Sequence, residues 1–116
     1  MKNYTVELTH SAESDLAGIY RFIAQHDSPE SAEKLFDKLS AACEKLSNFP
    51  GRGRRVLEFK SLLLDEYLES FSGPYRIIYT IKKHEVNVIG IFDGRRNLPE
   101  LIYRRAMAEL PDEVTF

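Results

Sequence analysis

The chain has 116 residues, of which 43% are hydrophobic and 29% are charged, a composition typical of one folded domain and not of a disordered segment. Its 16 basic and 18 acidic residues give a net charge of −2, so only a local basic patch could bind nucleic acid. The first residues lack the apolar stretch of a signal peptide, and no run approaches the ~20 apolar residues that span a bilayer, so we expect a cytoplasmic protein without a membrane partner.

Cysteine and histidine usage argues against a metal centre. The single cysteine, Cys43, falls on the apolar face of a predicted helix, where an inert core side chain is the main expectation and a reactive thiol the alternative. His10, His26 and His84 lie far apart and show no metal-ligand spacing. We predict no metal and no cofactor.

The chain begins with a predicted strand and a predicted helix. Tyr4, Val6 and Leu8 alternate with polar residues, which is strand periodicity. A helix follows over residues ~11–25, with Ser11 as its expected N-cap. Its apolar residues recur at helical spacing: Leu16, Ile19, Tyr20 and Ile23.

A second helix is predicted after a short break. Ser28 as N-cap and Pro29 at the first position form a strong start signal, and Asn48-Phe49-Pro50-Gly51 ends the helix near Ser47. Because few residues join the two helices, they should form an antiparallel hairpin.

The second half of the chain predicts strands. Residues 55–71 favour extended structure, although Leu62 to Leu68 fit a helical turn equally well. Residues 75–92 alternate in two runs about a turn at Lys83-His84, which predicts an antiparallel β-hairpin. Pro99 opens a last helix over ~99–109, in which Leu101, Ile102 and Met107 are candidate core residues.

These elements predict an α+β domain covering residues 1–116, with 110–116 as a candidate flexible tail. The helical hairpin would pack on one face of a mostly antiparallel sheet of three to four strands, followed by a short C-terminal helix. The other sheet face would be more polar and accessible. Strand alternation places Arg76 on that second face, together with Ile78, Thr80, Ile89, Ile91 and Asp93.

Several segments in this order resemble the RelE/ParE toxin superfamily, and ParE most closely. They are Leu46-Ser47-Asn48-Phe49-Pro50-Gly51-Arg52-Gly53-Arg54, Gly73-Pro74-Tyr75-Arg76-Ile77-Ile78-Tyr79, and Ile89-Gly90-Ile91-Phe92-Asp93-Gly94-Arg95-Arg96-Asn97-Leu98. The resemblance implies a β-α-α-β-β-β fold, growth inhibition by the free toxin, and a cognate antitoxin, a small DNA-binding protein encoded by an adjacent gene. It also leaves two mechanisms open: RelE-like members cleave mRNA on the ribosome, whereas ParE-like members act on DNA gyrase.

The candidate nuclease residues are Arg76, Arg95, Arg96 and Tyr103. The resemblance implies cationic roles for Arg76 and for an arginine after the last strand, and an acid/base role for a tyrosine near Tyr103. Each has a plainer interpretation. Arg76 would pair with Asp93, Arg95 and Arg96 would form a solvated turn, and Tyr103 would be a packing aromatic, because its ordinary pKa of ~10 makes it a weak acid near neutrality.

The charge pattern favours the ParE-like mechanism. A protein that works inside the ribosome gains from a strongly basic surface, whereas this chain is slightly acidic. The segment Leu63–Glu69 carries three acids and no base, and we expect those acids to repel RNA. Direct, sequence-specific binding of nucleic acid is not expected.

Two further groups of residues are candidates for binding the antitoxin or the target. Arg52, Arg54 and Arg55 form a basic cluster that suits carboxylate or phosphate, or else a solvated loop. Phe22 and Phe36 lie at the apolar margin of the helical hairpin, where they would serve an amphipathic partner helix, with core packing the stronger alternative for Phe36. A partner-binding module that has lost toxicity is the third functional hypothesis.

Overall fold

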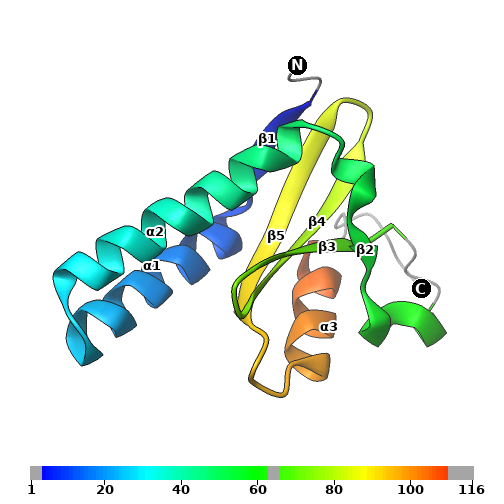
Figure 1. The fold of residues 1–116 in the computed structure, drawn as a ribbon. Helices are drawn as coiled ribbons and strands as arrows, with labels where there is room; N and C mark the ends of the chain where they lie inside the picture. Colours follow the sequence, from blue (N-terminus) through cyan, green and yellow to red (C-terminus); the bar gives the residue numbers. More distant parts are fainter. Residues whose placement is uncertain (1–3, 63–65, 110–116) are drawn as a thin grey trace.

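The computed structural model describes residues 4–62 and 66–109 as one domain, with a helical hairpin, a central sheet and a C-terminal helix (Figure 1). Its elements in chain order are β1 (Thr5–Leu8), α1 (His10–His26), α2 (Pro29–Glu44), the short 3-10 helices η1 (Lys45–Ser47) and η2 (Pro50–Arg52), β2 (Arg54–Arg55), a third 3-10 helix η3 (Leu57–Leu62), β3 (Leu68–Ser72), β4 (Tyr75–Lys82), β5 (Glu85–Asp93) and α3 (Pro99–Ala108). The predicted α+β class is confirmed. The candidate tail, 110–116, lies outside the described residues.

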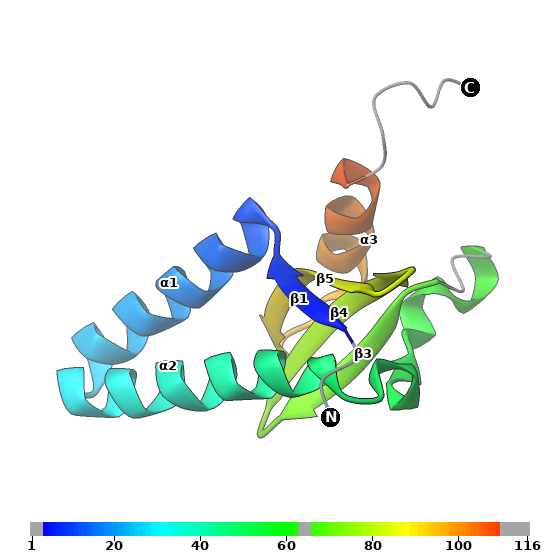
Figure 2. The ribbon, with the colours of Figure 1, turned by 90° about the horizontal axis from the view of Figure 1, so that it is seen from above.

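The two long helices begin at side-chain caps. The Ser28 side chain accepts the amide of Ser31, so the predicted start of α2 is confirmed. The predicted cap of α1 is wrong by two residues: Thr9, not Ser11, accepts the amide of Ala12, and the helix already begins at His10. Threonine caps through the same hydroxyl chemistry, and its extended backbone also closes β1. Both views show the hairpin tip projecting well beyond the sheet (Figures 1 and 2).

The sheet has five strands in the order β1-β5-β4-β3-β2, where the sequence predicted three or four. β1 pairs with β5 in parallel, and the remaining neighbours are antiparallel. The outermost strand, β2, has only two residues, which is too short for periodicity to reveal. Segment 55–71, which was ambiguous in sequence, contains the end of β2, η3 and most of β3.

The hairpin face of the sheet holds the first hydrophobic core. Leu16 of α1 and Leu39 of α2 pack there against Ile77 and Tyr79 of β4. Cys43 belongs to the same core, with an exposed fraction of 3%, as the inert interpretation predicted. The Tyr79 hydroxyl donates to the carbonyl of Pro50, which fastens the end of the helical layer to the middle of the sheet.

The opposite face is not the open polar surface that the sequence predicted. A second hydrophobic core closes it, formed by Val56, Phe59, Tyr67, Ile78, Ile89, Phe92, Leu98, Ile102 and Ala106. Of the three predicted core residues of α3, Ile102 is fully buried and Met107 packs at the margin, whereas Leu101 is exposed. The helix α3 crosses this face, so both sides of the sheet are covered (Figure 2).

A β-bulge explains why simple alternation misplaced two residues. The register shifts between Ile78, which pairs with Gly90, and Tyr79, which pairs with Val88, so Ile89 is an extra residue on β5. Beyond the bulge, Ile91 lies in the hairpin-side core, and Asp93 pairs with Tyr75 of that core. Within the described residues, no helix is long and apolar enough to cross a membrane.

Candidate functional site

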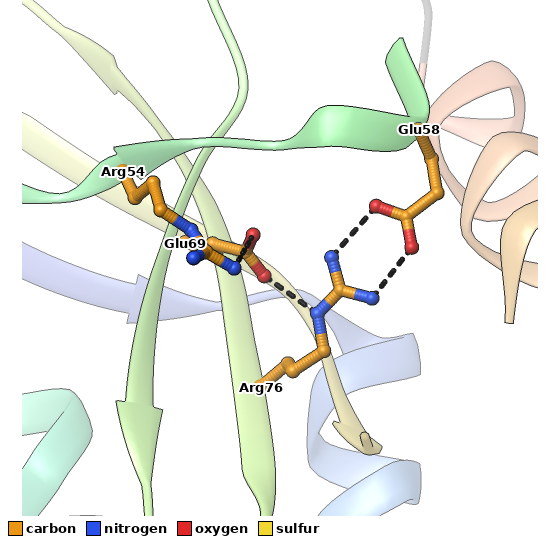
Figure 3. Close-up of polar contacts among 4 residues, drawn as sticks. All are labelled: Arg54, Glu58, Glu69 and Arg76. Carbon is orange, nitrogen blue, oxygen red and sulfur yellow. Dashed lines mark hydrogen bonds and ion pairs between the residues drawn. The ribbon is translucent and has the colours of Figure 1, made fainter. Parts of the chain in front are cut away.

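Arg76 is held between two carboxylates on the α3 side of the sheet (Figure 3). Its Nη1 and Nη2 donate to the two Glu58 oxygens at 2.6 and 2.8 Å, and its Nε donates to Glu69 Oε1 at 2.6 Å. The Glu69 side chain is fully buried, and that of Arg76 is only 12% exposed. The predicted pairing of Arg76 with Asp93 is therefore wrong, because the bulge puts Asp93 on the other face.

The surrounding charges hold this cluster in its ionised form. Arg54 donates to the other oxygen of Glu69 at 3.3 Å, so Glu69 bridges two arginines. Hydrogen bonds from Arg76 lower the pKa of the Glu58 carboxyl below its ordinary value, and the same bonds raise the pKa of Arg76. A carboxylate with a lowered pKa is a poor proton acceptor at neutral pH, so the Arg76 cluster is suited to holding structure rather than to transferring protons.

Arg95 and Arg96 lie at the corner after β5. The Arg95 side chain forms a two-point contact with Asp93, Nε to Oδ1 at 2.9 Å and Nη2 to Oδ2 at 2.7 Å. This contact lowers the pKa of Asp93 to about 2. Arg96 is exposed, and its amide donates to the Asp93 carbonyl. Both guanidiniums are accessible, as predicted.

Tyr103 lies on the outer side of α3. The neighbouring Ile102 and Ala106 point into the second core, and Tyr103 is 40% exposed. The four candidate nuclease residues therefore do not converge: Arg76 is enclosed by carboxylates, Arg95 and Arg96 form a solvated corner, and Tyr103 faces outward. Among residues 4–62 and 66–109, no group of histidine, cysteine and carboxylate side chains is arranged to hold a metal.

A groove of about 670 Å³ between α1, the end of β5 and α3 collects three of the predicted binding residues. We call it the α1 groove. Phe22, Arg95 and Arg96 line it together with the apolar Ile19, Ile23 and Leu101. Phe22 is 58% exposed and stacks on His26, so the structure favours a surface role for this side chain. Phe36 is also partly exposed, against the expectation of core packing, with its ring edge-on to Tyr20.

A second groove, of about 770 Å³, lies between the end of α2 and β3. We call it the α2 groove. Arg52 and Arg54 line it, with Phe49 and Phe71 beside them. Arg55 is the next residue of β2 and is exposed at the same sheet edge. The predicted binding residues thus divide between two surfaces, one beside α1 and one beside α2.

One polar contact that sequence reasoning missed joins α3 to α1. Arg105 Nη1 and Nη2 contact the Asp15 carboxylate at 2.6 and 3.0 Å, and Asp15 also accepts the amide of Ile91 at 3.0 Å. The two charges lie ninety positions apart in the chain. No local pattern connects residues at that separation, whereas the Glu100–Arg104 pair on the same helix has the regular four-residue spacing.

Comparisons with known proteins agree with this fold. The family described as "ParE toxin of type II toxin-antitoxin system, parDE" matches residues 6–98. Toxin ParE3 from Caulobacter vibrioides is 25% identical over 91 residues, which cover 78% of this chain and 86% of that protein.

Two solved structures share the architecture. The chromosomal ParDE TA system from P. aeruginosa aligns with a TM-score of 0.66 at 17% identity, covering 80% of this chain and 98% of the other. The toxin–antitoxin complex RelBE2 from Mycobacterium tuberculosis aligns with a TM-score of 0.55 at 24% identity, covering 80% and 93%. At these identities the structures support the fold alone, whereas the family match extends over most of the sequence. This chain belongs to the ParE toxin family of type II toxin–antitoxin systems.

Proposed function

We propose that the protein inhibits growth by acting on DNA gyrase and that it does not cut RNA. Its membership of the ParE toxin family favours the gyrase target. The observation that carries the second half of the proposal is the enclosure of Arg76 between Glu58 and Glu69. The proposed site of action is the cytoplasm, where gyrase and DNA are available.

RNA cleavage without a metal needs a base, an acid and a cation that is available to the phosphate. Arg76 is the best placed cation for that role by sequence, yet each of its three side-chain nitrogens donates to a carboxylate. A phosphate would have to displace two carboxylates from a largely buried position, which is costly because breaking a buried ion pair leaves a charge unpaired. This argument replaces the expectation that Glu69 repels RNA, since the Glu69 side chain is fully buried.

We also propose that a cognate antitoxin neutralises the protein. The P. aeruginosa structure is of a ParDE TA system, and the M. tuberculosis structure is a toxin–antitoxin complex. The α1 groove offers a surface for such a partner, because its apolar side chains lie next to the exposed cations Arg95 and Arg96. An amphipathic helix with an acidic flank would match both features. Arg76 is too enclosed to contribute to this contact.

Controlled expression in bacterial cells tests the proposal. We expect growth arrest with induction of the DNA-damage response, with transcripts that primer extension shows to be intact, and with growth restored by the antitoxin. Codon-phased cuts in mRNA without DNA damage would replace the gyrase proposal with the nuclease. Normal growth despite antitoxin binding would indicate a module that has lost toxicity.

Charge reversal separates the α1 groove from general electrostatics. Arg95→Glu with Arg96→Glu should weaken antitoxin rescue or gyrase poisoning, because both guanidiniums are exposed at the groove. Arg21→Glu with Arg104→Glu is the matched control, since it changes the net charge equally at exposed positions outside that groove.

A further inference from the structure

The outer edge of β3 is only half covered. The two-residue strand β2 pairs with β3 at Glu69 and Leu68 and then ends. Ser70, Phe71 and Ser72 continue β3 and pair with β4 on their inner side. In the described chain no strand pairs with these three residues on their outer side. Unpaired strand edges bind extended peptides readily, because their N–H and C=O groups need partners.

This open edge forms one wall of the α2 groove, where the accessible charges are all positive. Lys38, Lys45, Arg52 and Arg54 line the groove. Its one lining carboxylate, Glu69, is fully buried and already paired with Arg76 and Arg54. Lys38, Lys45 and Arg52 make no ion pair with the residues that the structure describes. A chain with a net charge of −2 thus concentrates positive charge along one groove.

Two arginine–phenylalanine contacts position the cations at this surface. The Arg52 guanidinium lies 4.5 Å from the centre of the Phe49 ring, and that of Arg54 lies 4.8 Å from the centre of the Phe71 ring. Both rings remain about half exposed or more, at 61% for Phe49 and 49% for Phe71. Stacking on a ring restricts the arginine side chain, so less entropy is lost when it binds a carboxylate.

We propose that the α2 groove binds an acidic peptide segment in extended conformation, added as a strand beside Ser70–Ser72. Carboxylates of the segment contact the lysines of α2 and the two stacked arginines. The open strand edge favours a peptide over a nucleic acid, because strand pairing requires both donors and acceptors whereas phosphodiesters offer acceptors alone. In the setting of the proposed function the segment belongs to the antitoxin, and to that extent this inference rests on that function.

Binding of a synthetic probe to the full chain tests the groove directly. The probe is a short capped peptide of alternating glutamate and threonine, compared with the same peptide N-methylated at every second residue. N-methylation removes strand hydrogen bonds but keeps the charge. The parent peptide should bind at least about tenfold more tightly than the methylated one, since main-chain hydrogen bonds supply affinity in strand addition. Equal affinities, or tighter binding of an oligothymidylate of equal charge, would overturn the proposal.

Charge-reversed variants locate the probe. Lys38→Glu with Lys45→Glu should weaken binding about tenfold or more, because like charges at a binding surface oppose one another. Arg21→Glu with Lys82→Glu is the control: it changes net charge equally at exposed residues outside the groove, and it should leave most of the affinity. An equal loss in both double variants would show non-specific attraction and contradict the assignment.

Amide hydrogen exchange gives a readout that charge alone does not move. Outward-facing amides among residues 70–72 should exchange more slowly in the presence of the parent peptide and unchanged in the presence of the methylated one. Protection confined to α2 would exclude strand addition. If the toxin still poisons gyrase and the antitoxin still neutralises it while these amides stay unprotected, the groove assignment fails and the proposed function stands.

Discussion

Asp15 of α1 and Arg105 of α3 are joined by two hydrogen bonds across the end of the sheet, at 2.6 and 3.0 Å. Both side chains are less than one fifth exposed, at 18% and 16%. Asp15 also accepts the Ile91 amide, and Arg105 also donates to the Ile89 carbonyl at 2.9 Å. This pair therefore connects the helical hairpin, β5 and α3, and with them the layers on the two sides of the sheet.

Replacing Asp15 should destabilise the whole fold. Asp15→Ala leaves the Arg105 guanidinium partly buried without its carboxylate and leaves the Ile91 amide without its acceptor, so we expect a loss of about 2–4 kcal/mol in the free energy of unfolding. Urea unfolding followed by circular dichroism measures this loss. The control is Glu100→Gln, which breaks a highly exposed pair on the same helix and should cost less than about 0.5 kcal/mol. Equal effects of the two substitutions would contradict the structural role of Asp15.

The Arg76 cluster should give stability a dependence on acid. The folded-state pKa of Glu58 lies below its ordinary 4.5, so its contribution is present above that value and is lost as pH falls through the lowered pKa. We therefore expect Glu58→Gln to be less stable than the parent at neutral pH and the difference to shrink toward zero in acid. Urea unfolding across the acidic range measures it. A difference that grows on acidification would show that the sign of the shift is wrong.

The corner after β5 makes a prediction at a single atom group. Asp93 should titrate at a pKa of about 2, because Arg95 donates to both of its oxygens. Arg95→Gln should raise that pKa toward the ordinary 3.8. Carboxyl carbon chemical shifts against pH report the value directly, and Arg104→Gln is the control that should leave it in place. An unchanged Asp93 titration in Arg95→Gln would refute the contact.

Cys43 should be unreactive in the folded protein. It is buried among hydrophobic side chains, and desolvation raises its pKa to about 11, so little thiolate exists at mildly alkaline pH. A thiol-specific chromogenic reagent should react slowly in native buffer and rapidly in denaturant. Reaction of the native protein at the speed of a free thiol would place Cys43 at the surface instead.

Local patterns were enough to predict the helical hairpin and the central strands. Ser28 and Pro29 act within one helical turn, so a window of a few residues contains the whole signal for the start of α2. The strands around Lys83 and His84 alternate clearly because one face packs against the hairpin core. The family resemblance then added the antitoxin and the two target mechanisms, which no pattern of residues shows by itself.

Non-local packing accounts for what the sequence did not predict. The extra residue Ile89 reverses the faces of Ile91 and Asp93, and a bulge leaves no mark in the alternation of similar apolar side chains. Glu58 and Glu69 reach Arg76 from two other elements, 18 and 7 positions away. Glu69 reads as one acid among several in its segment, and its burial follows only from the position of β3 beneath β2.

Gyrase activity in the presence of the purified protein tests the central claim most directly. Relaxed plasmid, gyrase and ATP are incubated with increasing toxin, with and without preincubated antitoxin, and the same preparation is added to ribosomes translating a defined mRNA. The account predicts loss of supercoiling or accumulation of cleaved plasmid, reversed by the antitoxin, with the mRNA left whole. Undisturbed supercoiling at toxin concentrations that cut the ribosome-bound mRNA would contradict it.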